Sequence, residues 1–141
     1  LYCSITDGTF IKSIDLEGKV PKRITISPCW GFVVVHSKTV EQAKKYFHLS
    51  VYTINGDKIC EEKIENSLIH MTTFRSKSGF DYILCVDAKM NVFAFEAYFL
   101  NVGQPVYQSS TPIVYVGFIE QQDAIFVLTR DGNVSLIPFT F

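Results

Sequence analysis

Residues 47–64 read Phe-His-Leu-Ser-Val-Tyr-Thr-Ile-Asn-Gly-Asp-Lys-Ile-Cys-Glu-Glu-Lys-Ile, and this stretch decides the fold class. A run rich in β-branched and aromatic residues leads into Asn55-Gly56 and then into a second apolar and charged run. Asn-Gly and Asp-Gly supply the positive φ angles of a type I′ turn, whose twist matches that of paired strands. The stretch therefore predicts a β-hairpin with Asn55-Gly56 at its tip.

The same pattern occurs at both ends of the chain. The further copies are residues 1–16, with Asp7-Gly8 at the turn, and residues 124–139, with Asp131-Gly132 at the turn. Because short hairpins recur along the whole chain, the sequence predicts an all-β protein.

The spacing of equivalent strands indicates the architecture. Phe74 lies 48 positions after Ile26, and Phe118 lies 44 positions after Phe74. A period of about 40 to 50 residues with four strands per unit is typical of β-propeller blades. We therefore expect a partial β-propeller of about three four-stranded antiparallel blades, similar to WD repeats.

The period divides the chain into four parts. Residues 1–19 are expected to end a preceding blade, residues 20–66 and 67–111 to form two blades, and residues 112–141 to form an incomplete last blade. The expected strands are Pro21–Pro28, Phe32–Ser37, Phe47–Ile54, Lys58–Ile64, Leu68–Arg75, Phe80–Asp87, Asn91–Ala97, Pro105–Ser110, Ile113–Glu120, Ala124–Arg130 and Asn133–Phe139. The chain opens on Leu1 and its last blade lacks an outer strand, so we expect the C-terminal part of a propeller whose remaining blades cover its open faces.

The composition of the chain limits the classes of partner that it can bind. The 141 residues are 48% hydrophobic, which is enough for a substantial core. A net charge of −1 with scattered basic residues gives no footprint for nucleic acid, and the apolar runs are too short for direct membrane insertion. The four cysteines, at positions 3, 29, 60 and 85, are widely spaced, which favours reduced thiols in the cytoplasm.

Two stretches resemble a WD-type repeat. Residues 26–34 run from an apolar strand through Ser27-Pro28 and Gly31 into a second apolar strand, and residues 50–59 are similar to the third strand, turn and fourth strand. The sequences of residues 4–11, 53–59 and 92–97 resemble that of the propeller at the C-terminus of BEACH-domain proteins of the neurobeachin and Chediak-Higashi type.

The chain departs from standard WD repeats at their most typical positions. The opening Gly-His is absent, and the closing Trp-Asp is replaced by Tyr52-Thr53, Phe95-Glu96 and Ile137-Pro138. The hydrogen-bond network of standard repeats is therefore not carried over to this chain.

The resemblance implies a non-catalytic protein–protein interaction propeller in a large cytoplasmic scaffold of membrane or vesicle trafficking. Such a propeller binds other proteins through its loops and reaches membranes through its partners. The alternative is a fragment of a propeller enzyme, or of a secreted carbohydrate-binding propeller, whose site lies in the missing blades. An upstream BEACH-like helical domain or a signal peptide would separate the two.

The sequence offers no catalytic, cofactor or metal site. His36, His48 and His70 lack an acidic or cysteine partner at the spacing of metal ligands, so we expect them to be ordinary strand residues. Glu61 and Glu62 are adjacent on one predicted strand and point to opposite faces, so they cannot act together on one glycosidic bond.

The candidate binding residues lie in predicted loops, where functional residues concentrate. Residues 37–47 are expected to be a loop inserted between two strands. The side chains proposed to contact a partner are Lys38, Lys44, Lys45, Tyr46 and Phe47, together with Trp30 in the preceding turn. Residues 98–100, Tyr-Phe-Leu, are expected to pack beneath the neighbouring blade.

Overall fold

The computed structural model describes residues 2–3, 10–100 and 104–139 of the chain. Over these residues the protein consists of antiparallel β-strands and one short 3-10 helix, η1 (Glu120–Gln122), without an α-helix. The all-β prediction is confirmed.

Three sheets contain nearly all of the strands. The first sheet holds β3 (Val20–Ile26), β4 (Val33–Glu41), β5 (Lys44–Tyr52) and β6 (Lys58–Ile64), and the second holds β7 (Leu68–Arg75), β8 (Asp81–Asp87), β9 (Asn91–Glu96) and β10 (Tyr107–Gln108). The third sheet holds β11 (Ile113–Ile119), β12 (Ala124–Thr129) and β13 (Val134–Pro138). In each sheet, strands that follow one another in sequence pair with one another. A separate pair, β1 (Tyr2–Cys3) and β2 (Phe10–Lys12), precedes them.

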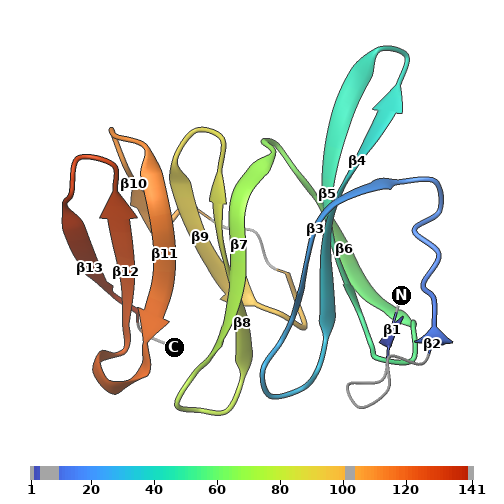
Figure 1. The fold of residues 1–141 in the computed structure, drawn as a ribbon, viewed down its shortest axis with the longest axis horizontal. Coiled ribbons are helices and arrows are strands. Elements are labelled where there is room, and N and C mark those ends of the chain that lie inside the picture. Colours follow the sequence, from blue (N-terminus) through green and yellow to red (C-terminus); the bar gives the residue numbers. More distant parts are fainter. Residues whose placement is uncertain (1, 4–9, 101–103, 140–141) are drawn as a thin grey trace.

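The three sheets stand side by side in the order of the sequence (Figure 1). The first strand of each sheet contacts the first strand of its neighbour, β3 against β7 and β7 against β11. In this arrangement the second sheet is packed between the other two. The first sheet covers one of its faces, and the third sheet covers the other.

Two apolar clusters hold the sheets together. The cluster between the first and second sheets contains Val34, Leu49, Val51, Leu68, Ile83, Cys85 and Phe95. The cluster between the second and third contains Phe74, Leu84, Val86, Val92, Ile113, Val116, Ile125 and Val127. Because side chains alternate along a strand, residues 83 and 85 of β8 pack on one neighbour and residues 84 and 86 on the other.

The outer faces of the first and third sheets are apolar. That of the first sheet is covered in part, because Val33, Val35 and Tyr52 are buried there against Ile14 and Leu16. On the first sheet Ile24 and Ile26 of β3 are 63% and 57% exposed. On the third sheet Val134 and Leu136 of β13 are 62% and 54% exposed. All four side chains are thus more than half exposed on these faces.

The hairpin at Asn55-Gly56 forms, but its turn type differs from the prediction. The Gly56 N–H donates to the Thr53 carbonyl at 2.9 Å, and Gly56 has a φ of 91°, whereas Asn55 does not adopt a positive φ. This is a three-residue loop closed by a glycine bulge rather than a two-residue type I′ turn. Asp131-Gly132 repeats it, with Gly132 at a φ of 87°. The predicted tip at Asp7-Gly8 lies outside the described residues.

The prediction of a loop over residues 37–47 is wrong. β4 continues to Glu41 and β5 begins at Lys44, with an unbroken antiparallel register between them. Only Gln42 and Ala43 lie in the turn, and both have positive φ angles, 49° and 65°. The type I′ turn of this chain is therefore here, at residues without the usual Asn-Gly signal.

One predicted strand is much shorter than expected. Of the range Pro105–Ser110, only Tyr107–Gln108 pairs as a strand, with residues 92 and 91 of β9. Val106 and Ser109 still donate backbone hydrogen bonds to β9 and the turn before it, so the segment follows the edge of the second sheet without regular pairing.

Candidate functional site

The β4–β5 hairpin projects past the turns of the other sheets at the same end of the molecule (Figure 1). Its strands are nine residues long, compared with seven for β8 and six for β12. The extra length lies beyond the neighbouring sheet, and therefore residues 40–45 are exposed. A protruding hairpin, whose exposed tip carries Val40, Lys44 and Lys45 and whose base carries Tyr46 and Phe47, replaces the loop expected from the sequence.

The register divides the candidate side chains between the two faces of the hairpin. Lys38 pairs with Phe47 and Val40 with Lys45, and these four share one face; Thr39 pairs with Tyr46 and Glu41 with Lys44, and these share the other. Lys44 and Lys45 therefore point in opposite directions. A partner that lies flat on one face would contact only one of the two lysines.

Each face is held at its base by a side-chain contact. The Lys63 Nζ lies 3.9 Å from the centre of the Tyr46 ring, a cation–π geometry. The Thr39 Oγ1 and His48 Nε2 are 2.7 Å apart on the same face. On the other face the rings of His36 and Phe47 have centroids 6.0 Å apart. These contacts stiffen the base, whereas the tip from Val40 to Lys45 stays free.

Trp30 lies at the opposite end of the first sheet, in the turn between β3 and β4, so the structure does not bring it together with the hairpin tip (Figure 1). Within that turn the Ser27 N–H donates to the Phe32 carbonyl, and the Phe32 N–H donates to the Ser27 Oγ, both at 2.9 Å. The Trp30 indole is 61% exposed, yet its Nε1 donates to the Gly79 carbonyl at 3.1 Å. The ring is thus exposed and fixed in place.

A buried carboxylate holds this turn against the second sheet. Asp81 of β8 is only 1% exposed and accepts hydrogen bonds from the backbone N–H groups of Cys29 (3.1 Å) and Trp30 (2.7 Å). Because a buried carboxylate needs such donors, the turn and β8 are tied to one another.

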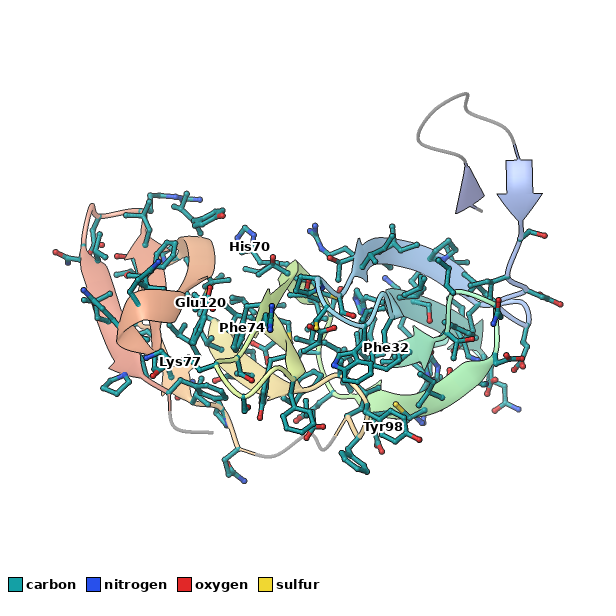
Figure 2. All side chains as sticks on the ribbon, turned by 90° about the horizontal axis from the view of Figure 1, so that it is seen from below. Phe32, His70, Phe74, Lys77, Tyr98 and Glu120 are labelled. Carbon is teal, nitrogen blue, oxygen red and sulfur yellow. The ribbon has the colours of Figure 1, made fainter. Side chains whose placement is uncertain are left out.

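An aromatic hollow of about 340 Å³ opens beside this junction, and this cavity is called the aromatic pocket below. It is lined by five aromatic residues and two acidic ones: Trp30, Phe32, Phe80, Tyr98, Phe99, Asp81 and Glu96. Figure 2 looks onto this end of the molecule and shows Phe32 and Tyr98 close together at the junction of the first two sheets.

The expectation for residues 98–100 is correct for one residue and wrong for two. Leu100 is fully buried in the cluster between the first two sheets, but Tyr98 and Phe99 are 51% and 66% exposed. The sequence reading missed the pocket because its walls come from three turns far apart in the chain. The available signal was the presence of Trp30, Phe80, Tyr98 and Phe99 at strand ends, where apolar rings are not needed for turn formation.

A second set of hydrogen bonds joins the first and second sheets, nearer to the β4–β5 hairpin. The Leu68 N–H donates to His36 Nε2 at 3.2 Å, and Arg23 Nε donates to the Leu68 carbonyl at 3.3 Å. Burial lowers the pKa of His36, and the charge of Arg23 lowers it further, against the hydrogen bond to the His48 carbonyl. A neutral His36 therefore belongs to the folded state.

A second cavity, of about 430 Å³, is lined by residues of both sheets, among them Cys85 and Asp87 of β8. Burial raises the pKa of Cys85, which keeps that thiol protonated. The Asp87 carboxylate accepts hydrogen bonds from Asn66, Asn91 and the Lys89 N–H, so it is already occupied in closing the β8–β9 turn.

The acidic pair on β6 confirms the expected geometry. Glu61 stands opposite Ser50 and Glu62 opposite Leu49, so the two point to different faces. Burial acts to raise the pKa of Glu61, but hydrogen bonds from Lys19, Ser50 and Lys58 outweigh it and lower the pKa to about 2. Glu61 is therefore a permanently charged acceptor at neutral pH.

The described residues contain no group of three or more His, Cys, Asp or Glu side chains arranged to hold a metal ion. Within the same ranges, no helix has the length and apolar character needed to cross a membrane. Cys29, Cys60 and Cys85 are free thiols. Burial raises the pKa of Cys60 to about 11.

Comparison of the chain with protein-family models, with curated proteins and with solved structures found no match.

Proposed function

We propose that this chain is a non-catalytic protein-interaction module and that its three sheets are successive blades of a β-propeller. The arrangement supporting the proposal is the sequential packing of antiparallel sheets with their first strands adjacent. In a propeller the first strands of the blades line a common axis. Further blades would cover the open faces at Ile24 and Leu136, and a further strand would pair with β13.

The observation that carries the binding role is the protruding β4–β5 hairpin. Its strands are longer than those of the other sheets, and residues 40–45 are exposed. Strand residues beyond a sheet contribute little to its core, so packing alone does not account for the extension. The exposed lysines and Val40 at its tip suit a partner with acidic and apolar groups.

The cellular setting follows from the sequence resemblance to BEACH-domain proteins. We propose that the chain serves a large cytoplasmic scaffold in membrane or vesicle trafficking and that it reaches membranes through its partners. This part of the proposal rests on analogy between sequences.

The opposite orientation of Lys44 and Lys45 gives a sharp test. The charge-reversal variants Lys44→Glu and Lys45→Glu are compared singly for capture of the partner proteins that the wild-type chain retains. We expect one variant to lose most of the capture and the other to lose little, because only one face meets the partner. Lys89→Glu, on an exposed turn at the same end of the second sheet, is the matched control.

The capture by each variant is compared with its melting temperature. All three lysines are exposed, so the melting temperature should change little. Equal capture by all the variants would remove the hairpin as the binding surface and contradict the proposal.

A further inference from the structure

We infer that the aromatic pocket binds the methylated ammonium group of a lysine side chain from a partner protein. The inference rests on the proposed function in one respect, namely that the occupant belongs to a protein. Its site is separate from the hairpin, because residues of the β3–β4 and β7–β8 turns line the pocket, and these turns lie at the end of the sheets opposite the β4–β5 hairpin (Figure 1). Its lining residues, among those that the structure describes, all come from the first two sheets and their turns.

The rings form walls rather than a filled core. Tyr98 and Phe99 have centroids 5.1 Å apart and planes at 79°, and Phe32 and Tyr98 have centroids 6.2 Å apart and planes at 50°. Rings set at such angles present faces in different directions around one space. Trp30, anchored on the Gly79 carbonyl, supplies a further fixed ring. A space of about 340 Å³ lies within the range of small-ligand sites, about 300–1,000 Å³.

The charge distribution favours a cation. The faces of aromatic rings are negative, and a cation above them is attracted. The buried Asp81 carboxylate, which also lines the pocket, accepts hydrogen bonds from the backbone N–H groups of Cys29 and Trp30. No lysine or arginine lines the pocket. The field of the pocket is therefore negative.

The apolar walls select a methylated over an unmodified ammonium. An unmodified lysine carries three N–H donors, which lose water on entering a space that offers almost no acceptor atoms. A trimethylammonium group keeps the positive charge but has no N–H to leave unpaired. Aromatic sites of this kind are a recurring means of binding quaternary ammonium groups.

The single tryptophan makes the test direct. Because Trp30 is the only tryptophan of the chain, its fluorescence reports on the pocket. A short acetylated and amidated peptide containing trimethyllysine is titrated into the full 141-residue chain. The same peptide carrying the neutral carbon isostere, in which a tert-butyl group replaces the trimethylammonium, is the matched control ligand. We expect saturable quenching or a shift by the charged peptide, and binding at least about fivefold weaker for the isostere.

Substitutions then test where the peptide binds. Their affinities are measured by calorimetry, because the Trp30 variants lack the fluorophore. Trp30→Ala should weaken binding of the charged peptide about tenfold, whereas Trp30→Phe, which keeps a ring, should recover part of it. Glu96→Gln, which removes a negative charge from the lining of the pocket without touching the Asp81 contacts to the Trp30 turn, should weaken binding of the charged peptide and leave the isostere unchanged. Tyr115→Ala, which removes an equally exposed ring from the third sheet, should have no effect.

Three results would overturn the inference. Equal affinity for the charged peptide and the isostere would make the pocket a purely apolar site. No saturable response to the charged peptide would remove the site altogether. A larger response to phosphatidylcholine vesicles than to the peptide would assign the rings to a lipid surface. Each of these outcomes can occur while the hairpin variants still alter partner capture, so the proposed function is tested separately.

Discussion

His36 joins two sheets through hydrogen bonds that fix its protonation. Because the Leu68 N–H donates to Nε2, that nitrogen must carry a lone pair, and the ring proton is then on Nδ1, 3.2 Å from the His48 carbonyl. A proton on Nε2 would face the Leu68 N–H. The fully buried ring therefore contributes to stability only in its neutral form.

Acidification should consequently destabilise the protein. The pKa of His36 is lowered in the folded state from the value of 6.5 expected for the unfolded chain, so the unfolded chain takes up the proton first. The stabilisation is complete above about pH 6.5 and decreases as the pH falls below it. The free energy of unfolding should therefore decrease between pH 7 and pH 5.

The variant His36→Gln isolates this contribution in urea unfolding at several pH values. It should lower the free energy of unfolding at pH 7 by about 1–3 kcal/mol, because a buried bond is lost or distorted. Its pH dependence between 7 and 5 should be flatter than that of the wild type. Burial also lowers the pKa of His48, and that contribution remains in both proteins. Identical slopes would show that His36 is not the titrating group.

The sequence correctly placed His36 on a strand, but it could not predict the bond to Leu68. That bond depends on how two sheets pack, and no local pattern specifies the register between residues 36 and 68. The same limit applies to Asp81, whose partners Cys29 and Trp30 lie about fifty positions away in the chain.

At the scale of elements, a serine or threonine is the first residue of the glycine-bulge turns. The Thr53 Oγ1 accepts from the Asp57 N–H at 3.2 Å, and the Ser76 Oγ accepts from the Phe80 N–H at 3.2 Å. A glycine follows each polar residue after three positions, at Gly56 and Gly79. This Ser/Thr-x-x-Gly pattern, rather than Asn-Gly alone, was the signal for the glycine-bulge turn.

The sequence did not predict the extension of the β4–β5 hairpin, because the outer half of this hairpin has no buried face. Alternation of apolar and polar residues marks a strand only where one side is covered. Residues 40–45 are exposed on both sides, so their polar composition was read as a loop. The turn residues Gln42 and Ala43 also lack the usual preference for positive φ.

Replacing Ala43 by glycine should therefore stabilise the hairpin. The φ of 65° at Ala43 costs an L-residue with a Cβ about 1–2 kcal/mol relative to glycine. We expect Ala43→Gly to raise the melting temperature. The control Ala88→Gly changes an exposed turn alanine outside the positive-φ residues and should lower it slightly or leave it unchanged. A lower melting temperature for Ala43→Gly would contradict the turn geometry.

At the scale of the whole molecule, the two outer faces dominate the expected behaviour. The recurring hairpins predicted an all-β chain, and the structure confirms it with sheets of four, four and three strands. The sequence could not show how fully each face is covered, because the alternation of β4 and β5 is apolar on both sides, as in Val33, Val34 and Val35.

The chain alone should self-associate through these faces. Sedimentation velocity should show species larger than a monomer, because open apolar sheet faces and the unpaired edge of β13 favour association. Ile24→Thr combined with Leu136→Thr should shift the distribution towards monomer. Val40→Thr, which changes an equally exposed apolar residue on the hairpin, should not. A compact wild-type monomer would count against the open-face account.

The central claim is that these sheets are neighbouring blades whose outer faces are completed by further sheets, leaving the turn ends free to bind. An experimental structure of the assembled protein tests it most directly. The account predicts that β3, β7 and β11 lie side by side around one axis, that a further β-sheet covers Ile24 and Ile26, and that a strand pairs with β13. A helix or solvent on those faces, with the edge of β13 unpaired, would contradict it.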